Sequence, residues 1–132
     1  MKTRKVLDAY ALLAYLKEER GHLRVKELMA SGAADLLINA VNVGEVFYIV
    51  AGARGLREAE YFLSVILPSL PITVLDDSFE EVIEAARLKA AHALSFADCL
   101  AAATAIRERA ALVTGDREFE KLGRVVDIDW LA

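Results

Sequence analysis

Short apolar runs alternate along this chain of 132 residues with longer segments in which apolar positions recur every three or four residues. Apolar runs bounded by Gly, Pro or charged residues predict buried strands, and the longer spacing predicts helices. The expected strands are residues 5–8, 36–38, 72–75, 111–114 and 125–128. The expected helices are residues 10–20, 23–30, 42–54, 56–67, 78–91, 96–110 and 117–122.

Short apolar strands separated by helices favour an α/β fold, in which helices cover both faces of a parallel sheet. The chain shows no internal repeat and no linker, so we expect one domain over residues 1–132. A hydrophobic content of 56% excludes a disordered or low-complexity chain. The single cysteine excludes an intramolecular disulfide and a cysteine-rich metal cluster.

The most apolar window, residues 36–53, is not expected to cross a membrane. Asn39, Asn42 and Glu45 lie near its middle, where a spanning helix would have to bury them at high cost. No secretory signal is visible, which favours a cytoplasmic protein. The net charge of −4 gives no overall attraction for nucleic acid, so a polyanionic substrate would need local basic patches or a bridging cation.

Acidic residues are expected to gather at one edge of the sheet, because ligands in open α/β folds bind at the carboxyl ends of the strands. Asp8 directly follows the first expected strand, and Asp116 follows the fourth. Glu45 and Asp98 lie in the first turns of helices that begin near the same edge. The sequence therefore predicts a shared carboxylate site.

Helix capping is the structural alternative for each acid taken alone. Asp8 and Asp116 could cap the helices that they precede. Asn42 and Ser95 each stand three residues before an acid, which is the spacing of a capping box. Capping does not require a common edge, however, so the four acids together favour a site.

Electrostatic repulsion indicates what such a site would bind. Two carboxylates about 5 Å apart repel by about 3 kcal/mol at an effective dielectric constant of about 20. Four in one cleft would take up protons or bind a cation. An all-oxygen site without His or Cys suits Mg²⁺ or Mn²⁺ better than zinc. Such an ion can hold phosphate oxygens and supply hydroxide for attack on phosphorus.

Four segments resemble the PIN-domain nucleases, and most of all the VapC-like ribonuclease toxins of type II toxin–antitoxin pairs. They are residues 6–8 (VLD), 42–46 (NVGEV), 95–102 (SFADCLAA) and 112–119 (LVTGDREF). The resemblance covers essentially the whole chain. It implies a three-layer sandwich with a five-stranded parallel sheet, and an endoribonuclease that uses Mg²⁺ or Mn²⁺ and a metal-activated water.

The resemblance also implies roles for individual residues. The catalytic and metal-binding acids would be Asp8, Glu45, Asp98 and Asp116, supported by Thr114 and Asn42. The chain departs from many family members at Ala9, where they carry Ser or Thr directly after the first Asp. Candidate contacts to substrate phosphates are Arg87, Lys89, Arg117 and Lys121, although each could be an ordinary solvated charge.

Apolar residues at 47–50 and 61–67 are too contiguous for one helix face to bury them all. Some should therefore be exposed and mark interfaces. Resemblance to the toxins implies a homodimer, which we expect through residues 56–67, and a VapB-like antitoxin lying along residues 10–16 and 42–50. RNA is the implied substrate.

Three alternatives remain open at this stage. The chain could be a PIN nuclease for RNA processing or quality control, or a catalytically inactive PIN module that binds proteins. Asp127 and Asp129 could form a second metal-binding pair, but a solvated last strand is the simpler interpretation.

Overall fold

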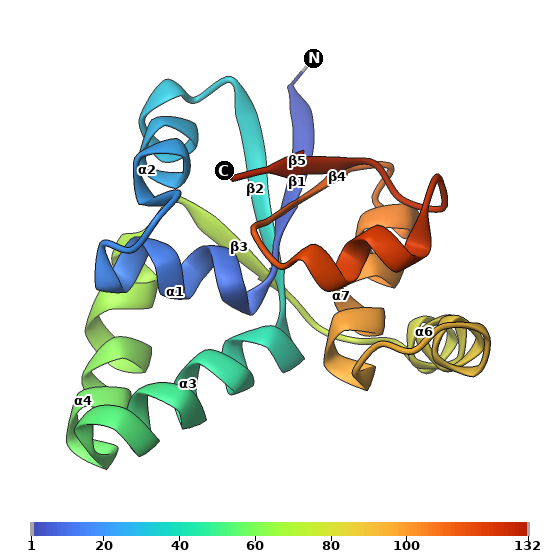
Figure 1. The fold of residues 1–132 in the computed structure, drawn as a ribbon. Coiled ribbons are helices and arrows are strands. Elements are labelled where there is room, and N and C mark those ends of the chain that lie inside the picture. Colours follow the sequence, from blue (N-terminus) through green and yellow to red (C-terminus); the bar gives the residue numbers. More distant parts are fainter. Residues whose placement is uncertain (1, 132) are drawn as a thin grey trace.

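The computed structural model describes residues 2–131, which form a parallel sheet between two layers of helices (Figure 1). The strands are β1 (Thr3–Leu7), β2 (Ala34–Asn39), β3 (Ile72–Leu75), β4 (Ala111–Thr114) and β5 (Ile128–Trp130). Their order in the sheet is β3-β2-β1-β4-β5, and every neighbouring pair is parallel. This arrangement confirms the expected five-stranded α/β sandwich.

The helices bring the chain back across the sheet between successive strands. They are α1 (Ala9–Lys17), α2 (His22–Ser31), α3 (Ala40–Arg54), α4 (Leu56–Tyr61), α5 (Leu67–Ser69), α6 (Phe79–Ala91) and α7 (Phe96–Arg107). A π-helical turn, η1 (Phe62–Ile66), joins α4 to α5, and a 3₁₀ helix, η2 (Arg117–Leu122), follows β4. None of the helices within residues 2–131 combines the length and apolar character needed to cross a lipid bilayer.

Alternating side chains of β1 divide the core between the two faces of the sheet. Val6 packs in the cluster formed with α6, α7 and η2, whereas Leu7 packs in the cluster formed with α1 and α2. On the same side as α1, a third cluster joins that helix to α3, η1 and α5. Because both faces are covered, the buried end of β1 carries two apolar residues in succession, Val6 and Leu7.

Several expected boundaries were wrong, and the last strand was the most displaced. Residues 125–128 were expected, but β5 is Ile128–Trp130. The backbone N–H of Leu112 bonds to the carbonyl of Asp127 at 2.8 Å, and that of Leu131 bonds to the carbonyl of Thr114 at 3.0 Å. Val126 instead packs as a buried loop residue. Apolar character alone could not separate this core contact from a strand position.

Helix ends also differ from expectation where the backbone adopts the left-handed conformation. Residues 10–20 were expected to form one helix, but α1 ends at Lys17 because Glu18 has a φ of 52°. The expected helix 96–110 ends at Arg107, and Arg109 has the same φ of 52°. The expected helix 56–67 is interrupted by the π-helical turn η1.

The interpretation of Asp129 as a solvated residue is wrong. Its side chain is only 15% exposed, and it accepts hydrogen bonds from Lys5 on β1 and, at 3.0 Å, from Arg24 on α2. Burial opposes ionisation of Asp129, but the bonds and charges of these two cations outweigh it and lower its pKa. Asp127, two residues earlier, is exposed as expected.

We expect Asp129→Asn to lower the free energy of unfolding at pH 7 by about 1–3 kcal/mol, since Lys5 and Arg24 would lose their shared carboxylate. A lowered pKa in the folded state means that this contribution is present above about pH 4 and is lost as the pH falls. Urea unfolding at pH 7 and pH 3 measures both effects. Asp127→Asn makes the same charge change at an exposed position and should have little effect; equal losses in the two variants at pH 7 would contradict the assignment.

Candidate active site

Asp8 lies at the carboxyl end of the central strand β1 and is only 3% exposed. One carboxylate oxygen, Oδ1, accepts a hydrogen bond from the backbone N–H of Ala11 at 2.9 Å. The other, Oδ2, accepts one from the hydroxyl of Thr114 at 2.6 Å. Asp8 therefore caps α1, and it does so from the sheet edge at which a carboxylate site is expected.

Thr114, fully buried at the end of β4, connects two of the acids. Its Oγ1 donates to Asp8 and accepts a hydrogen bond from the backbone N–H of Asp116 at 3.0 Å. Asp116 in turn caps η2, since its Oδ1 accepts from the N–H of Glu118 at 3.0 Å. One hydroxyl thus fixes the ends of two neighbouring strands relative to each other.

Gly115 lets a tyrosine ring close one side of this edge. A Cβ atom built at Gly115 would lie 2.4 Å from Cε1 of Tyr10, so any larger residue would collide with the ring. Tyr10 belongs to the first turn of α1 and remains 43% exposed. Tyr10 therefore packs directly against the residue that separates Thr114 from Asp116.

Glu45 is half-buried on α3 and is held by Asn42 one turn earlier. Asn42 Nδ2 donates to Oε1 of Glu45 at 2.7 Å and to the carbonyl oxygen of Ala97 on α7 at 3.3 Å. The expectation that Asn42 caps this helix was wrong: Asn39 does so, accepting a bond from Val41 N–H at 2.7 Å. Asn42 instead joins Glu45 to α7.

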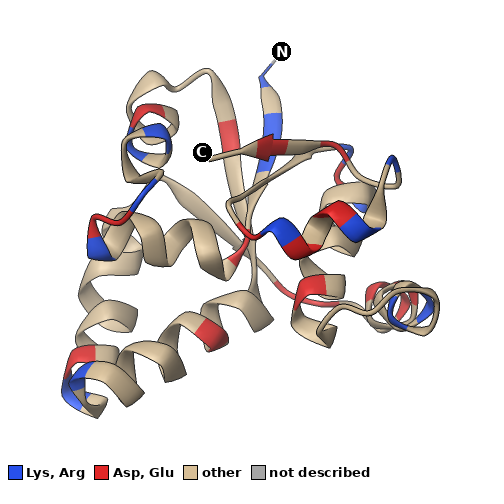
Figure 2. Cartoon of the chain, viewed as in Figure 1, with Lys and Arg blue, Asp and Glu red and all other residues tan. Residues whose placement is uncertain are grey.

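Asp98 lies half-buried in the first turn of α7. The hydroxyl of Ser95 accepts a hydrogen bond from its backbone N–H at 3.1 Å, which confirms the expected cap. Acidic segments at the ends of β1 and β4, on α3 and at the start of α7 lie around one edge of the sheet (Figure 2).

Burial and mutual repulsion raise the pKa of three of these acids. For Asp8, burial raises the pKa to about 7, the charges of Asp98 and Asp116 add to the effect, and the bonds from Thr114 and Ala11 oppose it. Burial is also the main cause of the raised pKa of Glu45, with a further contribution from Asp98. The four carboxylates therefore act on one another electrostatically.

Asp98 shows that a fifth acid belongs to the same region. Burial raises its pKa, the hydrogen bond involving Ser95 opposes this, and the charges of Asp116 and Glu118 contribute to the rise. Sequence reasoning missed Glu118, although it stands only two residues after Asp116.

The donor set fits a hard divalent cation in kind, since it consists of carboxylate and amide oxygens. Oδ1 of Asn42 is buried and accepts no hydrogen bond within the described part of the chain. In the same part of the chain, no three His, Cys, Asp or Glu side chains are arranged to hold a metal ion. The oxygens of Asp8 are bonded to Ala11 and Thr114, and one oxygen of Glu45 is bonded to Asn42. Because no three of the described acids are clustered, the carboxylates would have to move closer together to share an ion.

The candidate phosphate contacts lie on α6 and on η2, the helix that Asp116 caps. Arg87 pairs with Glu84 on the surface of α6, which also carries Lys89. Arg117 pairs with Glu120 at 3.2 Å and stacks 4.2 Å from the ring of Trp130.

Lys121, also on η2, contacts the acidic region. It pairs with Glu118, whose charge acts on Asp98, and donates to the carbonyl oxygen of Ala93 at 3.0 Å.

Comparison with known proteins adds a family and a shared fold. The family model described as the PIN domain matches residues 5–125. No curated protein sequence matches the chain at a significant level.

Solved structures with the same fold include DNA-bound VapBC from Salmonella typhimurium (TM-score 0.77, 18% identity, covering 98% of this chain and 99% of that one). VapBC2 from Rickettsia felis, bound to a promoter DNA fragment, has a TM-score of 0.76 at 19% identity, with 96% and 98% covered. VapC20 from Mycobacterium tuberculosis, described as a Sarcin-Ricin loop cleaving toxin, has a TM-score of 0.75 at 18% identity, with 90% and 95% covered. Since the family model spans nearly the whole chain and includes all four acids, the chain belongs to the PIN domain family.

Proposed function

We propose that this protein is a divalent-metal-dependent endoribonuclease and the toxin of a type II toxin–antitoxin pair. The observation that carries the proposal is the set of four carboxylates at one sheet edge, where burial and mutual charge raise the pKa of Asp8 to about 7. Membership of the PIN domain family supports a nuclease. The toxin assignment is supported by structural neighbours that are VapBC complexes and a loop-cleaving toxin.

In this proposal Asp8, Asp98 and Asp116 hold Mg²⁺ or Mn²⁺, and Glu45 binds the same ion or orients the attacking water. A bound divalent ion would neutralise the acids, polarise a phosphate oxygen and lower the pKa of a water molecule. Thr114 keeps Asp8 oriented through its 2.6 Å hydrogen bond.

Asn42 holds one oxygen of Glu45, which leaves the other to accept a proton from the attacking water. The raised pKa of Glu45 suits this role as a base. Hydrolysis breaks the bond between phosphorus and the 3′ oxygen, so the expected products carry 5′-phosphate and 3′-hydroxyl ends.

The exposed apolar residues divide into two proposed interfaces. Leu56, Tyr61, Leu63 and Val65 are exposed along α4 and η1, and we assign this face to the homodimer. A groove between α1, α3, α4 and η1 has an apolar floor of Leu16, Val50, Phe62 and Ile66, and the charged residues Lys17, Arg54 and Glu58 also line it. We assign this groove to the antitoxin segment. Phe62 is 1% exposed and belongs to the core rather than to the dimer surface.

The raised pKa of Asp8 predicts a stability that falls with pH. The carboxyl has an ordinary pKa of 3.8 in the unfolded chain and about 7 in the folded one. Between these values the unfolded state releases a proton that the folded state keeps, so the free energy of unfolding decreases by about 4 kcal/mol as the pH rises. This contribution is full below about pH 4 and lost above about pH 7.

Urea unfolding in EDTA from pH 4 to pH 8 measures this slope. Asp8→Asn should flatten it, whereas Asp35→Asn, an exposed acid at the amino end of β2, should not. Mn²⁺ added at pH 8 should stabilise the wild type and have much less effect on Asp8→Asn. Parallel curves for the wild type and Asp8→Asn would contradict the raised pKa.

Cleavage of single-stranded RNA tests the proposed activity. Activity should require Mg²⁺ or Mn²⁺, and Asp98→Asn should lower it at least about 100-fold, because the variant removes both a ligand and a negative charge. Asp35→Asn makes the same charge change away from the site and should keep wild-type activity. Cleavage that persists in EDTA, or products with 2′,3′-cyclic phosphate ends, would rule out the mechanism.

Sedimentation at tens of micromolar tests the homodimer. The wild type should sediment as a dimer, and Val65→Glu should give a monomer, because it places a charge in the proposed apolar interface. Leu23→Glu changes an exposed leucine on α2 and should remain dimeric. A monomeric wild type would remove the case for this interface.

A further inference from the structure

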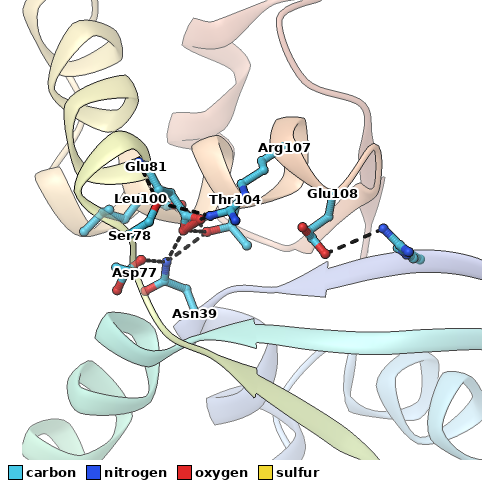
Figure 3. A network of polar contacts seen from close by, with 9 residues as sticks. Asn39, Asp77, Ser78, Glu81, Leu100, Thr104, Arg107 and Glu108 are labelled. Carbon is cyan, nitrogen blue, oxygen red and sulfur yellow. Dashed lines mark hydrogen bonds and ion pairs between the residues drawn. The ribbon is translucent and has the colours of Figure 1, made fainter.

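A second polar cluster lies buried where β2 and β3 approach α6 and α7 (Figure 3). Its centre is Glu81, a residue of α6 that is only 4% exposed. Asn39, at the end of β2, and Thr104, on α7, are completely buried beside it. Sequence reasoning assigned none of these residues to a site.

Hydrogen bonds join these residues across four elements. Glu81 accepts bonds from Thr104 Oγ1 at 2.8 Å, from Asn39 Nδ2 at 3.3 Å and from Arg107 at 3.1 Å. The two hydrogens of Asn39 Nδ2 are shared between Glu81, Thr104 Oγ1 at 2.9 Å and Asp77, which follows β3. The donors of three neighbours therefore converge on one buried carboxylate.

The hydrogen bonds to the Glu81 carboxylate matter because a buried charge without partners strongly destabilises a fold. A fully bonded polar network, in contrast, accepts only one arrangement of the elements that supply it. Ser78 caps α6 by accepting a bond from the backbone N–H of Glu81 at 3.1 Å, while the carboxylate of Glu81 points away from this cap to α7. The network thus specifies how α6 and α7 lie against the end of β2.

Helix α7 has few other means of fixing its position. Its buried face is built largely from small side chains, including Ala101, Ala102, Ala103 and Ala105. Methyl groups allow close packing, but they interdigitate less than large side chains do. The hydroxyl of Thr104 supplies the directional contact that the alanines cannot.

Asn39 connects the Glu81 network to α3, the helix that holds Glu45 at the acidic edge. Its Oδ1 caps α3 by accepting the N–H of Val41, while its Nδ2 holds Thr104. Asn42, one turn later, bonds to Glu45 and to the carbonyl of Ala97 on α7. These are the only two asparagines among the 132 residues, and both tie α3 to α7.

We propose that Asn39, Glu81 and Thr104 are positioning residues that set the placement of α3 against α7, and thereby the separation of Glu45 from Asp98. They lie outside the carboxylate set and act only through α3 and α7, the helices that carry Glu45 and Asp98. The catalytic consequence rests on the proposed function.

Thr104→Val tests the proposal with an isosteric loss of the hydroxyl, and Thr104→Ser is the conservative rescue. At saturating Mn²⁺, we expect Thr104→Val to lower kcat about 10-fold, with KM for RNA near the wild-type value. In a titration, the variant should bind Mn²⁺ several-fold more weakly than the wild type. Thr104→Ser should restore both. Hydrogen exchange should increase in the first turns of α3 and α7 and stay unchanged in α2.

Val25→Ala is the matched control, since it opens a cavity in the α1–α2 side of the core and lowers stability without touching the network. Measured well below both unfolding temperatures, it should keep the wild-type kcat and Mn²⁺ affinity. Equal losses in Val25→Ala and Thr104→Val, or wild-type values in Thr104→Val, would overturn the proposal.

The two proposals fail in different ways. A wild-type protein that neither binds Mn²⁺ nor cleaves RNA would defeat the proposed function, while hydrogen exchange would still decide whether the network ties α3 to α7. Unchanged exchange in Thr104→Val, together with an active wild type of unchanged kcat, would defeat the positioning role alone.

Discussion

The acidic edge of this molecule depends on the burial of one carboxyl group at the end of the central strand. Asp8 has β2 on one side and β4 on the other, so its position is enclosed by the sheet itself. The carboxylate is retained there because the N–H of Ala11 and the hydroxyl of Thr114 each bond to one of its oxygens. The same two bonds start α1 and fix the end of β4, so the fold and the candidate site share these atoms.

Carboxylates in this fold titrate according to what surrounds them. Burial raises the pKa of Asp8, and its nearest charges, Asp98 and Asp116, add to the rise. Asp129 is also buried in part, yet Lys5 and Arg24 lower its pKa. A carboxylate beside cations stabilises the fold as a charged group, whereas carboxylates beside one another favour protons or a cation. The first arrangement is structural, and the second is the one expected of a metal site.

Two polar clusters meet at the start of α3. Asn42 faces the acids and Asn39 faces the buried network around Glu81, so one helical turn borders both. At the acidic edge, the oxygens of Asp8 and Glu45 accept hydrogen bonds from within the protein, so under the proposed function these side chains would move to bind an ion. In the network, both carboxylate oxygens of Glu81 accept hydrogen bonds, and under the positioning proposal this network keeps α3 and α7 in place.

The sequence by itself determined where the candidate acids lie relative to the strands. Two acids follow the first and fourth strands, and two lie in the helices after the second strand and before the fourth. It also located β3 and β4 to the residue, because short apolar runs between breakers are local signals. The positions of Asp8 and Asp116 at a common edge followed from parallel pairing, which brings the carboxyl ends of all strands together.

Only the tertiary structure decided which partners each polar residue found. Asn42 has the spacing of a capping box in the sequence, but β2 ends at Asn39 and α3 begins directly after it, so Asn39 is the cap. The partners of Asp129 and Glu81 lie on distant elements, and no local periodicity encodes them. Strand β5 begins later than expected because the apolar Val126 packs in the core as a loop residue. Local sequence patterns indicate which residues are buried and which secondary structure they form. Hydrogen-bond partners, in contrast, lie far apart in the chain and are brought together only by the tertiary fold.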